Sequence, residues 1–156
     1  MYIRPFVPAD AGECAALIET TLRVTNARDY TPEELAAVIR RYSAAALLEY
    51  AARRHTIVAC GADGAILGCG AVGPDPALAD ACCLYTIFVL PDCQGKGIGR
   101  QIVARLEEEA RCMGAGRVLL HASVTALPFY RKLGYGYQNG IAEPDEDRLC
   151  SMEKRL

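Results

Sequence analysis

The residues of this chain best suited to chemistry form a glycine-rich segment between two apolar segments. It reads Gln94-Gly95-Lys96-Gly97-Ile98-Gly99-Arg100. Before it, residues 82–90 are apolar and β-branched up to Pro91-Asp92, a pattern that predicts a strand buried on both faces. After it, apolar residues recur at helical spacing, at positions 98, 102, 103, 106 and 110. The glycines therefore connect a strand to the start of a helix.

A glycine-rich turn at a helix start is suited to binding an anion. Glycine has no Cβ atom, so the main chain can approach a ligand closely. The first N–H groups of a helix have no partner inside it, and the helix dipole favours negative charge beside them. Lys96 and Arg100 add positive side chains. The segment therefore predicts a cradle for a phosphate or pyrophosphate group.

Two common phosphate-binding motifs do not fit this segment. A Walker loop requires Ser or Thr directly after its lysine, whereas Gly97 follows Lys96 here. The dinucleotide-binding fingerprint requires a third glycine where this chain has Arg100, and it opens a βαβ unit that is missing here. We therefore expect a phosphate-bearing ligand of another kind than those that these two motifs bind.

The spacing that does fit is Gln94-x-x-Gly97-x-Gly99 after a strand that ends in Phe88-Val89. Farther along, the chain reads Ser-Val-Thr-Ala-Leu-Pro-Phe-Tyr-Arg-Lys-Leu-Gly-Tyr over residues 123–135. The first segment resembles the acetyl-coenzyme-A loop of the GCN5-related N-acetyltransferase (GNAT) family, and the second resembles that family's other signature. The resemblance implies an acyltransferase that uses acetyl-coenzyme A (acetyl-CoA) and releases coenzyme A.

The resemblance also implies which residues hold the cofactor. The main chain of the glycine-rich segment would bind its phosphates, through Gln94, Gly95, Lys96, Gly97, Ile98, Gly99 and Arg100. The main chain at Ile87, Phe88 and Val89 would align the pantetheine arm. Ser123 stands where many relatives carry an asparagine that bonds this arm, so its hydroxyl is expected to make that contact instead.

The reaction implied by the family is direct attack of an amine on the thioester. The leaving thiolate needs a proton, and Tyr130 stands at the family's position for the general acid. The amine must also lose a proton, because an ordinary amine with a pKa of ~10.4 is uncharged in only about one molecule in 2,500 at pH 7. Some protein-acetylating relatives carry a glutamate for this at the position of Cys83. The remaining candidates for the base are Asp80, Tyr85 and His121.

The acceptor is expected to be a primary amine, on a small molecule or on a protein. In the family, the segment between the first two helices overhangs the acceptor, which makes Asn26, Arg28, Asp29 and Tyr30 candidate contacts. Tyr85 and His121 are further candidates. Absence of the strand glutamate favours a small molecule. Two alternatives stay open: a non-catalytic acetyl-CoA-binding regulatory module, and a transferase acting on protein N-termini or lysines.

Composition argues against several classes of partner. The 156 residues carry a formal net charge of −2 and no long basic run, so neither nucleic acid nor an anionic membrane is expected. No segment approaches the ~18 apolar residues of a membrane span, and residues 1–5 lack the apolar part of a signal peptide. We therefore expect a cytoplasmic protein. A homodimer through a free sheet edge is a further expectation.

The cysteines and histidines do not have the spacing of a metal site. The chain has 8 cysteines and 2 histidines but no Cys-x-x-Cys pair. Most cysteines fall inside expected strands or helices, where they behave as small apolar residues. We expect no metal and no disulfide. Cys93 is the one thiol expected to be exposed.

Periodicity and turn residues predict one domain over residues 1–156. Strands are expected at 2–6, 55–61, 65–72, 82–90, 117–123, 135–138 and 148–154. Helices are expected to start at a capping box of Asp10 and Glu13 and at a second of Thr31 and Glu34, with a further helical piece at 43–53 and helices at 98–113 and 125–133. The order βααβββαβαββ indicates a mixed α/β sheet with helices on both faces. The resemblance implies about seven mostly antiparallel strands.

Overall fold

A seven-stranded sheet forms the centre of the protein in the computed structural model, which describes residues 1–156. The strands are β1 (Tyr2–Pro5), β2 (His55–Cys60), β3 (Ile66–Pro74), β4 (Ala81–Val89), β5 (Arg117–Ser123), β6 (Gly136–Tyr137) and β7 (Leu149–Arg155). Their spatial order is β1-β2-β3-β4-β5-β7-β6. Only β4 and β5 pair in parallel. The mixed, mostly antiparallel sheet expected from the sequence is confirmed.

Five helices accompany the sheet: α1 (Ala11–Thr25), α2 (Pro32–Arg40), α3 (Ala44–Ala51), α4 (Ile98–Cys112) and α5 (Leu127–Lys132). The capping box at the start of α2 is confirmed, because Thr31 Oγ1 accepts from Glu34 N and Glu34 accepts from Thr31 N. α3 is a separate helix because Ser43 caps it through a bond from Ala46 N. α1 continues to Thr25 and is followed by a short 3₁₀ turn at Ala27–Asp29.

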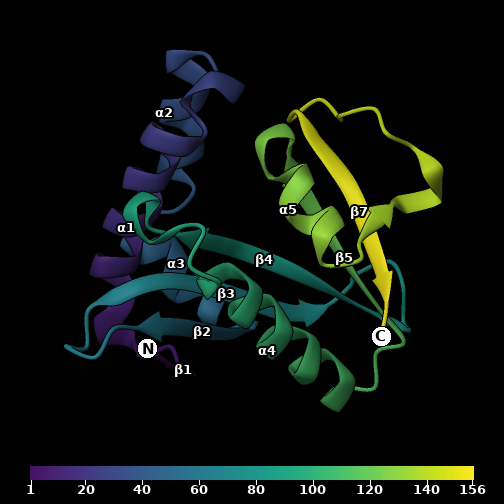
Figure 1. Cartoon of the computed structure of the whole chain (residues 1–156), viewed down its shortest axis with the longest axis horizontal. Coiled ribbons are helices and arrows are strands. Elements are labelled where there is room, and N and C mark those ends of the chain that lie inside the picture. The colour runs from purple at the N-terminus through teal and green to yellow at the C-terminus, as the bar shows by residue number, and fades with distance from the viewer.

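The helices cover both faces of the sheet (Figure 1). α4 and α5 bury one apolar cluster against the sheet, centred on fully buried side chains such as Ile102, Leu106 and Met152. α1, α2 and α3 bury a second cluster on the opposite face, which includes Ile18, Leu35 and Leu47. Burial of this apolar surface is the main stabilising contribution to such a layered fold.

Close packing of α4 on the sheet explains a glycine inside a strand. A Cβ atom added to Gly70 in β3 would lie 2.7 Å from Ile102 Cγ2 and 2.9 Å from Leu106 Cδ1. Any larger residue would therefore push α4 away from β3. This contact fixes the position of α4, and with it the position of the glycine-rich segment that leads into the helix.

The sheet opens between its two central strands. β4 and β5 are paired only from Ala81 to Cys83 and from Arg117 to Leu119. Beyond these residues the strands diverge, and Figure 1 shows β5 and β7 turning away from β4. A cavity lies at this divergence, and Figure 1 shows α1 and α2 on one side of it and α5 and the loop before β7 on the other.

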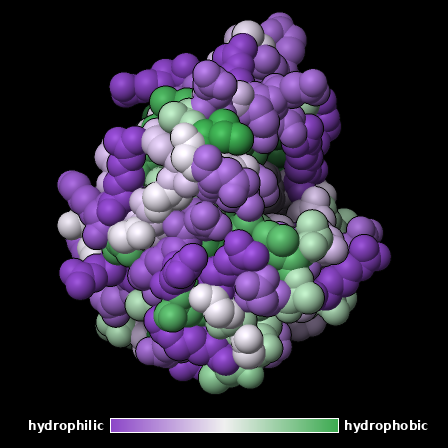
Figure 2. Space-filling model, turned by 90° about the vertical axis from the view of Figure 1, so that its right-hand side faces the viewer, coloured by the Kyte–Doolittle hydropathy of each residue, from purple (hydrophilic) through white to green (hydrophobic).

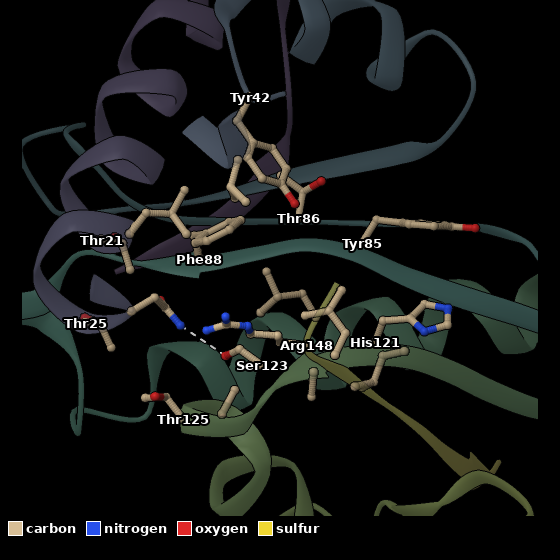
Figure 3. Close-up of a pocket in the computed structure, with 18 of the residues that line it drawn as sticks. Thr21, Thr25, Tyr42, Tyr85, Thr86, Phe88, His121, Ser123, Thr125 and Arg148 are labelled. Atoms are coloured by element: carbon tan, nitrogen blue, oxygen red, sulfur yellow. Dashed lines mark hydrogen bonds between the residues drawn. The ribbon is translucent and has the colours of Figure 1, made fainter. Parts of the chain in front are cut away.

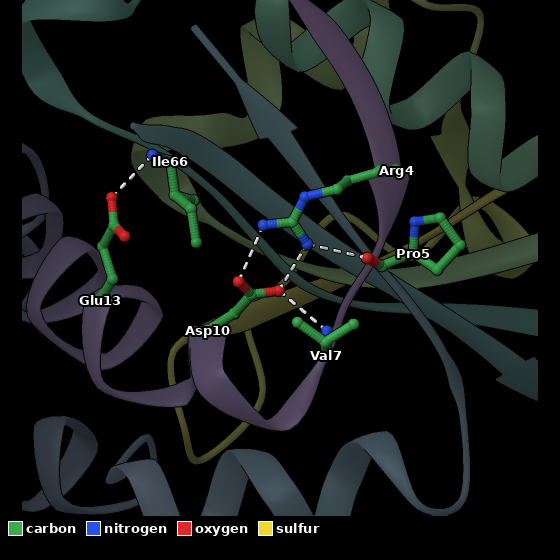
Figure 4. Close-up of polar contacts among 6 residues, drawn as sticks. All are labelled: Arg4, Pro5, Val7, Asp10, Glu13 and Ile66. Atoms are coloured by element: carbon green, nitrogen blue, oxygen red, sulfur yellow. Dashed lines mark hydrogen bonds and ion pairs between the residues drawn. The ribbon is translucent and has the colours of Figure 1, made fainter. Parts of the chain in front are cut away.

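The start of α1 differs from the expected capping box (Figure 4). Asp10 accepts from Arg4 Nη1 at 2.7 Å, from Arg4 Nη2 at 2.9 Å and from Val7 N at 2.8 Å. Glu13 does not reach back to Asp10. It accepts instead from Ile66 N at 2.7 Å and joins α1 to β3. The prediction was wrong because tertiary partners compete for both carboxylates.

The exposure of the cysteines and the hydropathy of the surface can be compared with the predictions from sequence. All eight cysteines are free thiols, but Cys112 at the end of α4 is exposed while Cys93 is half-buried, so the expectation that Cys93 is the exposed thiol was wrong. On the side of the molecule seen in Figure 2, hydrophilic residues predominate and hydrophobic residues form small separate groups. No helix is both long enough and apolar enough to cross a membrane.

Candidate active site

A cavity of about 570 Å³ occupies the cleft between β4 and β5. Its floor is formed by the diverging strands, including Leu84, Ile87, Leu120 and Ala122. Residues of α1, α2, α5 and the loop before β7 complete its walls. Figure 3 shows side chains of these elements pointing toward one another across the cavity. Segments distant in the sequence therefore meet at the place where the sheet opens.

The glycine-rich segment lies at one end of this cavity. Gly95 and Gly97 have φ angles of +74° and +84°, a region that favours glycine. A Cβ atom added to either residue would meet no atom within 4 Å, so the space beside the turn is open. None of the main-chain N–H groups from Gly95 to Arg100 donates a hydrogen bond within the chain. A row of free donors at a helix N-terminus is an anion-binding arrangement.

The side chain of Gln94 connects the glycine-rich turn to neighbouring elements. Its side-chain amide donates to Val89 O at 3.0 Å and to Thr25 Oγ1 at 3.2 Å. It therefore ties the glycine-rich turn to the end of β4 and the end of α1. Thr21 Oγ1 also lies 3.2 Å from Val89 O. The Val89 carbonyl is therefore already engaged within the chain.

The other residues of the segment point in different directions. Gly95 and Gly99 line the main cavity, whereas the Ile98 side chain is buried in the core beneath α4. Arg100 lines a second cavity of about 490 Å³ between α4 and α5, together with Lys132 and Lys154. Ile98 can therefore act on a ligand only through its main chain, while Arg100 has a side chain on a basic surface nearby.

An irregularity in β4 sets the direction of the cavity wall. Cys69 pairs with Phe88 and Ala71 with Tyr85, so Thr86 and Ile87 both lie opposite Gly70. Thr86 has a φ of +55°, which is rare for a β-branched residue and costs on the order of 1–3 kcal/mol. The bulge places Leu84 and Ile87, three positions apart, on the α4 side of the sheet. It therefore bends the strand at the middle of the cavity.

Tyr130 reaches the cavity from α5. The residue is 7% exposed and packs edge-to-face on Phe129 and Tyr135. The residue lines the cavity, and none of the side-chain hydrogen bonds of the chain involves its hydroxyl. Burial raises the pKa of the Tyr130 phenol above its usual value, and nearby Tyr42 raises it further. Its proton therefore stays in place at neutral pH and is available to a group in the cavity.

Polar bonds join the two sides of the cleft, and we call them the cross-cleft network; Figure 3 draws the bond that Ser123 accepts. Asn26 Nδ2 donates to Ser123 Oγ at 3.0 Å, and Thr125 Oγ1 donates to Asp29 Oδ1 at 2.8 Å. Arg148 donates to Asp29 O at 3.1 Å and pairs with Glu34 at 3.3 Å. Arg41 pairs with Asp147 at 3.7 Å. The residues are Asn26, Asp29, Glu34 and Arg41 on one side and Ser123, Thr125, Asp147 and Arg148 on the other.

Sequence reasoning found only part of this network. Asn26 and Tyr30 do line the cavity, but Arg28 and Asp29 do not. Arg41, Tyr42 and Arg148 also line it and were not expected there. Arg148 sits at a φ of +61° in a turn closed by Asp145, which aims its side chain across the cleft. The position of Arg148 could have been predicted only from this left-handed turn. The acidic residues of the loop do not indicate that such a turn forms.

The three candidates for the base are placed differently. Asp80 is bonded to Arg117 at 3.0 Å and does not line the cavity. Tyr85 lines it, with the Arg54 guanidinium 3.7 Å above its ring, and burial raises the pKa of its phenol to about 12. His121 lines it as well, and its Nδ1 lies 3.1 Å from Ser151 Oγ. No three His, Cys, Asp or Glu side chains are arranged to hold a metal ion.

Comparison with known proteins agrees with this architecture. The family model of the acetyltransferase (GNAT) domain matches residues 26–156. The IAA acetyltransferase of Azospirillum brasilense is 36% identical over 97 residues, which are 60% of this chain and 63% of that protein. The chloroplastic serotonin N-acetyltransferase 2 of Oryza sativa subsp. japonica is 36% identical over 52 residues, 33% of this chain and 26% of that protein.

Solved structures agree over almost the whole chain. The paia N-acetyltransferase of Thermoplasma acidophilum, crystallised in complex with coenzyme A, superposes with a TM-score of 0.85. The superposition covers 99% of this chain and 98% of that one at 21% sequence identity, so it supports the fold. Together with the match of the family model over residues 26–156, it establishes that the chain belongs to the GNAT acetyltransferase family.

Proposed function

We propose that this protein transfers an acetyl group from acetyl-CoA to the primary amine of a small molecule. The observation that carries the proposal is the row of free main-chain N–H groups from Gly95 to Arg100 at the end of the cleft. Family membership and the two sequence signatures support the same reading.

The residues present fit a pyrophosphate-bearing cofactor. Free N–H donors to a charged oxygen contribute about 1.5–3 kcal/mol each. The open space beside Gly95 and Gly97 would admit the anion, and a side chain at Gly97 would fill it. Lys96 and Arg100 add positive charge close by. Bound acetyl-CoA would supply an acetyl thioester, and the main chain of Ile87 and Phe88 beside the bulge would align it in the cleft.

Tyr130 is the proposed general acid. Its phenol lines the cavity and keeps its proton at neutral pH. It would hold that proton as a hydrogen bond to the leaving sulfur and release it as negative charge develops there. The Ser123 hydroxyl accepts a bond from Asn26, so its O–H remains as the donor to the pantetheine arm.

The acceptor side of the cleft favours a small molecule over a protein. The cross-cleft network spans the opening, so a folded protein could reach the cavity only by breaking bonds such as Arg148–Glu34 and Arg41–Asp147. The names of two relatives, which refer to IAA and to serotonin, fit an acceptor of low molecular mass. A cytoplasmic location and a dimer stay predictions.

Calorimetry and thiol release would test the proposal. We expect acetyl-CoA to bind the wild-type protein with micromolar affinity, and some member of a panel of small primary amines to cause release of free thiol. Binding without release from any small amine or peptide would favour a regulatory module. Release with peptides alone would favour a transferase acting on proteins. Absence of binding would contradict the proposal itself.

A further inference from the structure

His121 is the one histidine in the cleft, and a single hydrogen bond orients it. It lies on β5 directly opposite Ser151 of β7, and its Nδ1 is 3.1 Å from Ser151 Oγ. The side chain is exposed and lines the cavity, while Ser151 is half-buried. The other histidine, His55, starts β2 and does not line the cavity. A histidine fixed through Nδ1 presents Nε2 to its surroundings.

The position of His121 follows from the pairing of the sheet. The last paired residues of β4 and β5 are Cys83 and Leu119, which share one face of the sheet. Tyr85 and His121 are each two residues farther along, so they are the next side chains on that face. Here the strands have begun to part, and Figure 3 shows the His121 ring facing the cleft below Tyr85. His121 therefore stands where the cavity begins, on its acceptor side.

Three other titratable side chains of the cleft are poorly suited to remove a proton. Tyr85 keeps its phenolic proton at neutral pH, since burial raises its pKa to about 12. The bond from Thr31 N lowers the pKa of the Glu34 carboxyl, and Glu34 also pairs with Arg148. Asp147 pairs with Arg41. His121 is the one titratable side chain lining the cavity whose only polar partner is a neutral hydroxyl.

We propose that His121 removes the proton from the acceptor amine and that Ser151 positions it by accepting a hydrogen bond from Nδ1–H. The proposal rests on the proposed acetyltransferase function. In this step one N–H bond of the acceptor ammonium breaks and an N–H bond forms at Nε2 of His121. The freed electron pair stays on the amine nitrogen, the imidazolium later gives its proton to water, and nothing is oxidised or reduced.

Several charged groups around His121 have partners of their own. Glu153, two residues beyond Ser151 on β7, lies 3.7 Å from Arg117, which also bonds Asp80. Arg54 stacks on Tyr85, and Arg148 pairs with Glu34. The remaining titratable groups on this side of the cavity are Tyr30, Tyr42, Arg41, Glu146 and Asp147. Ser151 is thus the group whose removal is expected to change the ring most directly.

Imidazole nitrogen NMR on the whole protein would test the positioning without any turnover. With two histidines, the His55→Gln variant assigns the His121 signals. We expect the neutral ring of His121 to carry its proton mainly on Nδ1, and Ser151→Ala to shift it toward Nε2. A wild-type ring protonated mainly on Nε2 would overturn the proposal, because that nitrogen could then only donate.

Kinetics with the best acceptor amine would test the chemistry. His121→Gln should lower kcat about 10²-fold or more at neutral pH and recover partly at high pH, where the amine loses its proton unaided. The His121→Gln substitution should also remove the acid limb of the pH profile of kcat/KM and leave acetyl-CoA affinity unchanged. In the His121→Ala variant, added imidazole should restore part of the rate. His55→Gln is the matched control. An unchanged pH profile in His121→Gln would overturn the proposal, whereas a wild-type protein inactive with every amine would instead refute the acetyltransferase function.

Discussion

The glycine-rich turn and the cross-cleft network face the same cavity but are built in different ways. The turn offers main-chain N–H groups from consecutive residues, Gly95 to Arg100, at the start of a helix held by the core. The network offers side chains from the segment after α1, from α2 and the residue that follows it, from the end of β5 and the residues after it, and from the loop before β7. A main-chain site depends on few residue types, and its ligand binding is lost as a whole when the shape of the turn changes. Each exposed side-chain pair contributes little free energy, so losing one pair has a small effect.

The largest expected effect is in the turn. Gly97→Val should weaken acetyl-CoA binding at least 100-fold, because the new side chain would fill the open cradle and strain a φ of +84°. Isothermal calorimetry measures the affinity. Gly64→Val is the matched control, since Gly64 has a φ of +88° and equally open space in a hairpin turn away from the cleft. Equal acetyl-CoA affinities of Gly97→Val and Gly64→Val would show that the glycine-rich turn does not bind the cofactor.

The next effect separates chemistry from binding. Tyr130→Phe should lower kcat about 100-fold while acetyl-CoA affinity stays within a factor of two or three of wild type. Tyr135→Phe is the contrasting control: it removes the 2.8 Å bond to buried Glu107, outside the cavity, and should cost about 1 kcal/mol of stability with little change in kcat. Stopped-flow thiol detection and thermal unfolding measure the two quantities. Unchanged turnover in Tyr130→Phe would show that Tyr130 is not the acid.

A third prediction concerns stability away from both regions. Asp10→Asn should lower the free energy of unfolding by about 2 kcal/mol at pH 7 and leave turnover unchanged. Bonds from Arg4 and Val7 lower the pKa of Asp10. The native ion pair therefore stabilises the protein above the unfolded-state pKa of ~3.9, and this contribution is lost as pH falls through the lower folded-state pKa.

Urea unfolding at several pH values checks this prediction. The difference between wild type and Asp10→Asn should be constant near neutrality and shrink in acid. Glu143→Gln removes the same charge from an exposed position and serves as control. A difference that grew in acid would contradict the assigned role of the Arg4–Asp10 pair.

The smallest effect is expected in the cross-cleft network. Arg148→Ala should change KM for the acceptor only a few-fold, because its partners are exposed and each pair contributes about 0–1 kcal/mol. The effect should fade at high salt. Acetyl-CoA affinity should not change. Arg155→Ala is the control, because Arg155 is an exposed arginine at the end of β7 and lies outside the network. A loss of acetyl-CoA binding in Arg148→Ala would mean that the two regions are not separable.

The same difference explains what the sequence could predict. Spacing alone located the glycine-rich turn, because a strand, glycines and a helix follow one another along the chain. It also placed β5 at its observed bounds, Arg117–Ser123, and the capping box of α2. It missed Arg148 and Arg41, because nothing local in the sequence indicates which side chains meet across a cleft.

A further error has the same origin. Glu13 was expected to cap its own helix, but it bonds Ile66 in β3. Its polar side chain found a partner from a distant part of the chain. Motifs thus predict residue types and places well, and predict partners less well.

An amide NMR titration with coenzyme A would test the central claim most directly. The N–H signals of Gly95 to Arg100 are predicted to shift together and to become protected from exchange with solvent, since these groups have no acceptor in the free protein. The same signals should stay unmoved in Gly97→Val. Binding that left these signals unchanged while shifting others would contradict the account.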